Sequence, residues 1–320
     1  MNNITIKDIA DAAGVSPATV SRAMKNGKNV SAAASRSVRE AAEKLGYTGN
    51  ARTEYIKSGR VLITTPDLSP ERLNIINGSK KALQQSEKEM LIFVTDGTTA
   101  RENIAAQICA EHIADGVLAI DPVNAESFLE KLPIGYPAAF CGCDCESELC
   151  AAKSDYAKMG RDVGNYLASR GKEHIVLIAE FEPKDNLRAF EAAFADTFDE
   201  RTANVRIYRC DLTAEGGAET AARVFSDSPP DAVTCVSDVC LLGVMRGAKR
   251  LVCEAASNCL WVGIGNTPYS KLGTAPFSTI DLSYATIGKS TAERLIERIN
   301  IIAPPERACE IVPHMLIIRE

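Results

Sequence analysis

The stretch that decides the fold of this chain is Thr5-Ile-Lys-Asp-Ile-Ala-Asp-Ala-Ala-Gly14, followed by Val15-Ser-Pro-Ala-Thr-Val-Ser-Arg22. Thr5 stands three positions before Asp8, the spacing at which two side chains cap the start of a helix reciprocally. Apolar residues then recur at the spacing of one buried helical face until Gly14, a typical helix stop. Ser16 and Pro17 restart the chain as the cap and first residue of a second helix. The sequence therefore predicts two short helices joined by a tight turn.

A third short helix is predicted between the cap Ser31 and the stop Gly46. Its apolar stripe is Val38, Ala41, Ala42 and Leu45. Three such helices match the helix-turn-helix pattern, and a generic three-helix bundle is the alternative. Charge argues against that alternative. Residues 1–60 hold ten lysines and arginines against five carboxylates, a net +5, which leaves −11 for the remaining chain because the whole carries −6. A basic head on an acidic body indicates that the head meets phosphate.

The head also resembles a known family. The residues that carry this resemblance are Thr5-Ile-Lys-Asp-Ile-Ala10, Gly14-Val-Ser16, Thr19-Val-Ser-Arg22, Val30-Ser31, Leu45-Gly-Tyr47 and Asn50-Ala51. They are similar to the head piece of the LacI/GalR family of bacterial regulators, and a weaker resemblance continues to the C-terminus. The resemblance implies that Pro17, Ala18 and Arg22 face base edges in the major groove. It further implies a set of backbone and supporting contacts: Ile6, Ser16, Thr19, Ser21, Ser31 and Asn50.

The segment after the head resembles the family's hinge, which becomes helical on DNA and inserts a leucine into the minor groove. Ile56 stands in the leucine position, and an isoleucine can also wedge a base step apart. Gly49 and Glu54 depart from the family pattern, and a plain flexible linker is the alternative. These boundaries predict a head at 1–47, a hinge at 48–59 and an effector-binding and dimerisation domain at 60–320.

Beyond the hinge, strand-like and helical stretches alternate. Continuous apolar runs occur at 61–65, 90–95, 116–120, 174–179, 232–236 and 260–264. Such runs predict parallel sheets covered on both faces, and about 260 residues exceed one ordinary core. We therefore expect an α/β fold with two lobes, similar to periplasmic binding proteins, behind the helix-turn-helix head.

Ligands of such sheets bind outside the carboxyl ends of the strands. The effector-binding residues predicted there are Ser69, Asp96, Asn186, Asp238 and Asn266. Asn186 stands where the family usually has an arginine, and Gly265-Asn-Thr-Pro268 is similar to trehalose-type repressors. The resemblance implies a small sugar or sugar derivative as effector, whose identity does not follow from the sequence.

Eleven cysteines without a secretory signal or a long apolar segment favour a reducing cytoplasm. Cys141, Cys143, Cys145 and Cys150 crowd into a predicted loop between the lobes. Their spacing lacks the two-residue gaps of structural zinc sites, so free thiols are the preferred interpretation and no metal or cofactor is expected.

Three functions stay open at this point. The leading hypothesis is a repressor that binds a palindromic DNA operator as a homodimer, possibly a tetramer, under effector control. The second is a DNA-binding protein whose effector site has decayed, which Asn186 suggests. The third is a sugar-metabolising enzyme, since an α/β scaffold permits one. No nucleophile-base motif surrounds His112, His174 or His314, and no phosphate-binding glycine loop is present, so we predict that the chain is not an enzyme.

Overall fold

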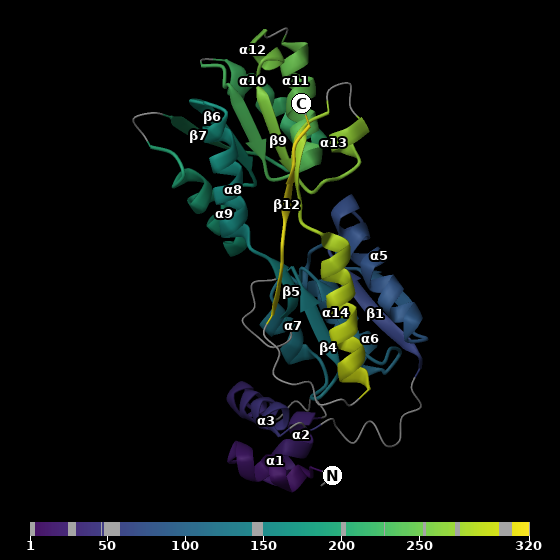
Figure 1. Cartoon of the computed structure of the whole chain (residues 1–320). Helices are drawn as coiled ribbons and strands as arrows, with labels where there is room; N and C mark the ends of the chain where they lie inside the picture. Colours follow the sequence, from purple (N-terminus) through teal and green to yellow (C-terminus); the bar gives the residue numbers. More distant parts are fainter. Residues whose placement is uncertain are drawn as a thin grey trace. The chain divides into compact units, whose positions relative to one another are not determined.

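The structure is a computed structural model of the 320-residue chain, and it describes residues 4–24, 30–45, 47, 58–142, 150–199, 203–226, 228–251, 254–272, 276–300 and 309–319. The chain divides into two compact units. The first unit comprises residues 1–153 and 285–310, and the second comprises 154–284 and 311–320. The head therefore belongs to the first unit. Figure 1 shows each unit's elements in sequence colours.

The head contains the three predicted helices. They are α1 (Ile6–Ala13), α2 (Pro17–Met24) and α3 (Ala32–Lys44). Thr5 and Asp8 form the predicted capping box, and Gly14 ends α1 with a φ of 65°, in the left-handed region that suits glycine. Ile9, Val20 and Val38 are fully buried and contribute one side chain from each helix to a single core. Gly46, the predicted stop of α3, lies outside the described residues.

The rest of the first unit is a six-stranded sheet covered by helices. Its elements, in chain order, are β1 (Arg60–Thr65), α5 (Pro70–Gln85), β2 (Glu89–Val94), α6 (Thr99–Ala110), β3 (Val117–Ile120), α7 (Ala125–Lys131), β4 (Ala138–Cys141), β5 (Cys150–Ser154), α14 (Tyr284–Ile299) and β11 (Glu310–Val312). The strand order is β11-β5-β4-β3-β1-β2. Leu62, Phe140 and Phe128 share a core cluster that joins β1 and β4 to α6 and α7 on one face.

The other face of this sheet is covered by α5 and α14, which lie beside each other (Figure 1). Gly78 of α5 approaches α14 so closely that a Cβ there would lie 2.0 Å from the carbonyl oxygen of Ala285. The hydroxyl of Ser79 also donates to the carbonyl oxygen of Gly288 at 3.0 Å. A helix from far along the chain thus completes the first unit.

The second unit has the same layered plan. Its elements are α8 (Tyr156–Ser169), β6 (His174–Ala179), α9 (Asp185–Ala195), β7 (Asn204–Arg209), α10 (Ala214–Phe225), β8 (Ala232–Cys235), α11 (Asp238–Arg250), α12 (Glu254–Ser257), β9 (Leu260–Ile264), α13 (Tyr269–Leu272), β10 (Ser278–Asp281) and β12 (Met315–Ile317). The strand order is β12-β10-β9-β8-β6-β7, and only the β10–β12 pair among the described ladders is antiparallel. Val176 faces the core with α10 and α11, whereas Leu177 faces α8 and α9, the alternation expected of a strand covered on both sides.

The predicted α/β fold with a helix-turn-helix head is confirmed, and each predicted strand coincides with an observed one. Short or polar strands were missed, notably β5 and β7, because their sequences lack a continuous apolar run. Over the described parts of the chain, none of the helices has the length and apolar character needed to cross a bilayer.

Candidate DNA-binding surface and effector site

The exposed face of α2 presents the residues predicted to contact DNA. Ser16, Pro17, Ala18 and Arg22 are exposed, while Thr19 and Ser21 are half-buried. The Ser16 hydroxyl caps the helix by accepting a hydrogen bond from the Thr19 backbone N–H at 3.1 Å. It also lies 2.9 Å from the Thr19 hydroxyl, so both hydroxyls lie at the N-terminal end of α2. A capped helix start with exposed hydroxyls and N–H groups favours phosphate contact.

The other predicted DNA contacts are less uniform in their surroundings. Arg22 folds back along α2, its Nε donating to the carbonyl oxygen of Ala18 at 3.1 Å. Ser31 is exposed and caps α3 through the Ala34 N–H, whereas Ile6 is half-buried against the head's core. Asn50 and Ile56, the predicted hinge contacts, lie outside the described residues. The bond to Ala18 uses one of the five guanidinium N–H donors of Arg22.

The head packs against the sheet domain of its own unit through α3. The guanidinium of Arg39 donates to the carbonyl oxygens of Glu130 at 3.1 Å and Leu132 at 2.9 Å. Leu132 is the C-cap of α7, so the buried cation satisfies carbonyls that a helix end leaves without partners. Ile134 belongs to the head's core cluster. Sequence reasoning missed this contact because more than 90 positions separate Arg39 from its partners, and no sequence motif connects residues so far apart.

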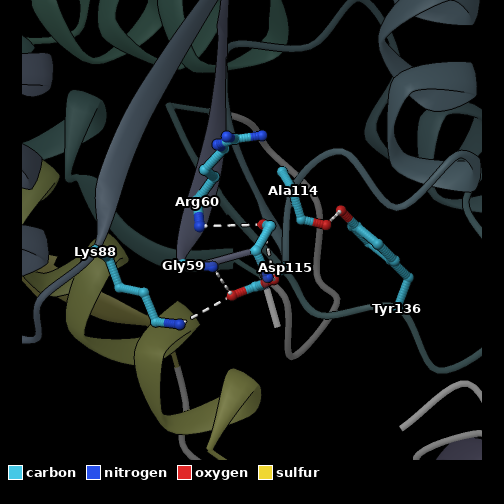
Figure 2. A network of polar contacts seen from close by, with 7 residues as sticks. Gly59, Arg60, Lys88, Ala114, Asp115 and Tyr136 are labelled. Carbon is cyan, nitrogen blue, oxygen red and sulfur yellow. Dashed lines mark hydrogen bonds and ion pairs between the residues drawn. The ribbon is translucent and has the colours of Figure 1, made fainter. Parts of the chain in front are cut away.

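A second polar network holds the chain where the hinge segment meets β1 (Figure 2). One oxygen of Asp115 accepts the N–H and hydroxyl of Ser58 at 2.7 and 2.9 Å. The other accepts the Gly59 N–H at 3.0 Å and the Lys88 ammonium at 2.9 Å. Burial alone would raise the pKa of Asp115, but these hydrogen bonds outweigh it and hold the pKa below its usual value. The anion therefore anchors Ser58 and Gly59, the last two residues of the predicted hinge.

The carboxyl ends of the first unit's strands carry strained backbone and charged side chains. Asp96 after β2 and Asp121 after β3 adopt φ values of 50° and 44°, which L residues rarely take. The strand order reverses between β1 and β3, and such a switch point is where α/β sheets bind ligands. Asp121 and the β1–α5 loop that carries Ser69 therefore border the expected site.

Asp121 is held in place by two neighbours from different elements. Arg72, in the first turn of α5, forms an ion pair with its carboxylate. Gly142, just past β4, leaves the space that its carboxylate occupies, since a Cβ at Gly142 would lie 2.2 Å from Oδ1. Both charged side chains are mostly buried, at 24 and 12 % exposure. No sequence motif indicated the pairing of Asp121 with Arg72.

The predicted effector residues of this unit lie at the ends of neighbouring strands. Ser69 is half-buried at the start of α5, and its N–H donates to Asp67 at 2.8 Å. Asp96 is 63 % exposed and pairs with Arg101 at 3.2 Å. Ser69 and Asp96 thus border the same edge of the sheet, where the carboxyl ends of β1 and β2 lie. The Asp96 carboxylate contacts the guanidinium of Arg101 there.

Asp238 of the second unit is fully buried at the start of α11. One of its oxygens accepts the N–H and hydroxyl of Thr267 at 2.7 and 2.9 Å, and the other accepts the Thr279 hydroxyl at 2.6 Å. This carboxylate joins the loop after β9 and the second residue of β10 to α11. The geometry favours a structural role, and direct effector contact stays a prediction for Asp238.

Asn266 and Asn186 occupy different surroundings in the second unit. The Asn266 side chain donates to Asp281 at 2.8 Å and accepts from Arg319 at 2.9 Å. Asn186 is half-buried on α9, where its oxygen accepts the N–H of Leu187 at 2.8 Å. Asp238 and Asn266 are thereby brought to the same end of β9, whereas Asn186 follows β6. None of these contacts identifies a ligand.

An arginine near α9 was missed by sequence reasoning. Arg209 ends β7 and forms two hydrogen bonds to Glu191 of α9, at 2.5 and 2.6 Å. It also donates to the carbonyl oxygen of Glu180, the residue after β6, at 3.1 Å. Burial raises the pKa of Glu180. The arginine at the end of β6 is thus supplied by β7, whose sequence contains no motif that predicts it.

The predicted cysteine loop needs a correction. Cys141 ends β4 and Cys150 begins β5, and both are buried, so these two cysteines lie on strands. Cys143 and Cys145 lie outside the described residues. In the described ranges, His, Cys, Asp and Glu side chains form no group of three that could hold a metal ion.

One cavity of about 580 Å³ opens in the first unit, away from the predicted effector residues. It lies among α5, α14, β5 and β11. Its lining residues are Ala82, Gln85, Ser86, Ala151, Ser290, Glu293, Arg294, Ile296, Glu297 and Glu310. These do not include a residue from the strand ends at the β1–β3 switch point.

Comparisons with known proteins agree with this geometry. Residues 5–50 match the family described as bacterial regulatory proteins, lacI family, and residues 165–320 match a periplasmic binding protein-like domain. The transcriptional repressor PurR of Aliivibrio fischeri is 23% identical over 328 residues, covering 98% of this chain and 96% of its own. A CelR-cellobiose complex superimposes with a TM-score of 0.69 at 20% identity over 99% of both chains. The lac repressor dimer bound to operator and the anti-inducer ONPF gives 0.68 at 18% identity, over 99% of this chain and 98% of the other.

Proposed function

We propose that the chain is a regulator of the LacI type, and that it represses transcription by binding a palindromic operator as a homodimer under the control of a small sugar-like effector. Its relatives are transcriptional repressors, so the chain is a DNA-binding regulator and not an enzyme. The head at 1–47, the hinge at 48–59 and the effector domain at 60–320 are the parts of this proposal, and the cytoplasm is its compartment.

The observation that carries the proposal is the exposed, capped start of α2 on a basic head. Small hydroxyl side chains at Ser16, Thr19 and Ser21 can hold phosphates without blocking a close approach. Arg22 is the one exposed side chain of the predicted row that can form two hydrogen bonds to a guanine. A dimer doubles these few contacts, which is how small heads of this kind reach useful affinity.

The test of DNA binding is a selection of bound sequences from a random pool, followed by mobility shifts at fixed salt. We expect an inverted repeat, and loss of the specific complex when residues 1–60 are deleted. Arg22→Ala should weaken binding to the selected site by about 1–3 kcal/mol and relax its preference at one position. Ser16→Ala is the matched control, since it should weaken specific and random DNA alike. Equal weakening of both DNAs by Arg22→Ala would make Arg22 a phosphate contact only.

The charges at the strand ends favour a neutral effector. In the first unit the described carboxylates Asp67, Glu71, Asp96 and Asp121 outnumber Arg72 and Arg101, and both guanidiniums are paired with a carboxylate. A phosphorylated or carboxylated ligand would meet net negative charge there. A polyol hydroxyl can donate to a carboxylate and accept from a guanidinium, so the Arg72–Asp121 pair fits such a ligand. The similar CelR structure is a complex with cellobiose.

Thermal-shift screening of neutral sugars, sugar phosphates and sugar acids tests this class, because a ligand of the folded state raises its melting temperature. We expect stabilisation by neutral sugars and its loss in Asp121→Asn. Glu111→Gln is the matched control, because Glu111 is an exposed carboxylate at the C-terminal end of α6, away from the carboxyl ends of the strands. The effector must also bind the operator complex and the free protein with different affinities if it controls the switch. Stabilisation by no compound of the screen would favour a regulator without an effector.

The dimer is tested separately by sedimentation of the full chain with and without operator. A homodimer on one palindrome is expected, and a tetramer would bring two operators into one complex. A monomer bound to a single half-site would contradict the proposed assembly.

A further inference from the structure

Two cysteines from distant parts of the chain meet at the edge of the first unit's sheet. Cys150 is the first residue of β5, and Cys309 immediately precedes β11, the neighbouring strand. Their sulfur atoms lie 3.2 Å apart, although 159 positions separate them in the sequence. A disulfide bond is about 2.05 Å long and joins Cα atoms 4.4–6.8 Å apart, a range that neighbouring strands provide. The pair therefore needs only a small side-chain adjustment to become a bond.

The two thiols differ in access. Cys150 is fully buried, whereas Cys309 is half-buried immediately before a three-residue edge strand. A dissolved oxidant can thus reach Cys309, and Cys150 is placed to resolve the product behind it. The sequence alone offered Cys150 only as one member of a cysteine-rich segment, because nothing local connects it to Cys309.

We propose that Cys150 and Cys309 are a thiol–disulfide site that hydrogen peroxide closes and thiol reductants reopen. The Cys309 sulfur attacks one peroxide oxygen, the O–O bond breaks, and the leaving hydroxide takes a proton to become water. The Cys150 sulfur then attacks the sulfenic sulfur of Cys309, the S–O bond breaks, and the second hydroxide leaves as water with the Cys150 proton. Two thiols lose two electrons to one peroxide, and two waters result.

The bond would join two of the three places where the chain passes between the units. The chain leaves the first unit after Lys153, three residues beyond Cys150, and again after Glu310, one residue beyond Cys309. β11 is a three-residue edge strand, so few backbone hydrogen bonds can hold it to β5. A covalent link to β5 would therefore restrict its motion. Oxidation would thereby add a second input to the regulator, a consequence that rests on the proposed function, whereas the bond itself does not.

A second close pair supplies an internal control. Cys210 and Cys240 lie 3.6 Å apart in the second unit, and both are buried. The hydrogen bond with Cys240 and burial raise the pKa of the Cys210 thiol, which keeps it protonated and unreactive. The sulfur atoms of this pair are similarly close, but a dissolved oxidant cannot reach either of them. The pair should therefore stay reduced under conditions that oxidise Cys150 and Cys309.

The experiment treats the reduced, full-length chain with a slight excess of hydrogen peroxide, blocks remaining thiols, and maps linked peptides by mass spectrometry without reduction. We expect a Cys150–Cys309 peptide at least tenfold more abundant than a Cys210–Cys240 peptide, and its disappearance after dithiothreitol. Cys309→Ser should abolish it, and Cys210→Ser should leave it unchanged. The oxidised parent should melt at a higher temperature than the reduced parent, and Cys309→Ser should show no such difference.

Cys309→Ser keeps the test independent of folding defects, because Cys309 is half-buried and Cys150 is not replaced. Absence of the linked peptide, equal yields from the two pairs, or a dominant bond from Cys150 to Cys143 or Cys145 would overturn the proposal. DNA binding is not needed for any of these readouts, so failure of the proposed function and failure of this site are separable.

Discussion

Replacing Asp115 by asparagine tests whether the anchor at the end of the hinge is electrostatic. The side chain of Asp115 is 2 % exposed and accepts four hydrogen bonds, two on each oxygen. Asparagine keeps one acceptor oxygen and presents an NH2 group where the second oxygen stood. In either orientation of the amide, two of the four donors around this side chain meet the NH2 group and lose their acceptor.

The magnitude follows from the two lost bonds. Hydrogen bonds to a charged group contribute about 1.5–3 kcal/mol each, so Asp115→Asn should lower the free energy of unfolding by about 3–6 kcal/mol. Asp115→Asn also takes the anion away from the mostly buried Lys88 ammonium, and leaving such a charge uncompensated costs about 3–5 kcal/mol, which agrees. Lys88→Met is the matched control: it removes one bond and leaves three donors on the carboxylate, so its effect should be about 1.5–3 kcal/mol. The double variant should lose less than the sum of the two.

Urea unfolding followed by two signals can assign the loss to one unit. Trp261 is the only tryptophan and lies in the second unit, so its fluorescence reports that unit, while circular dichroism reports both. With a slope of about 2 kcal/mol per molar urea, a loss of about 4 kcal/mol moves the midpoint of the first unit by about 2 M. A shift below about 0.5 M, or an equal shift of the Trp261 signal, would refute this account of the anchor.

The same carboxylate makes a pH prediction. Burial opposes ionisation of Asp115, but hydrogen bonds from Lys88 and Ser58 hold its pKa below the ordinary value of 3.8. A lowered pKa in the folded state stabilises the fold fully above the ordinary pKa, and the contribution is lost as pH falls through the lowered value. The stability difference between the parent and Asp115→Asn should therefore be constant at neutral pH and shrink below about pH 4. A difference that is unchanged at pH 3 would contradict the assignment.

Two further substitutions test contacts within the first unit. Arg39→Ala removes one buried and one partly buried hydrogen bond to carbonyl oxygens at the end of α7, so the head should be released by trypsin at least tenfold faster. Arg39→Lys can keep one bond and should show an intermediate rate, and equal rates for all three proteins would mean that this contact does not hold the head. Gly142→Ala should destabilise the first unit by about 2–5 kcal/mol and weaken effector binding, because it combines a left-handed φ of 72° with a clash against Asp121. Gly97→Ala, with a φ of 60° and only an ordinary contact, should lose about 1–2 kcal/mol, and similar losses for the two glycine variants would show that Asp121 yields freely.

What the sequence determined by itself is the local structure and the architecture built from it. Thr5 with Asp8, Gly14, and Ser16 with Pro17 fix helix starts and stops through backbone N–H groups within three or four residues, and the structure confirms each of them. The apolar runs located six of the described strands. Four of them, β1, β3, β6 and β8, are buried along nearly their whole length, and burial on both faces leaves no room for polar alternation. The match of residues 5–50 to the lacI family of regulatory proteins also followed from these short motifs.

The tertiary structure alone decided which distant residues meet. Asp115 with Ser58, Arg39 with Leu132, Arg72 with Asp121 and Cys150 with Cys309 are separated by 49 to 159 positions, and no periodicity connects such pairs. Asp238 is a further example. Its position after a strand was predictable from the sequence, but its burial against Thr267 and Thr279 was not. Local sequence determines where a strand ends. The spatial arrangement of the strands and helices determines which distant side chain becomes the partner of a given residue.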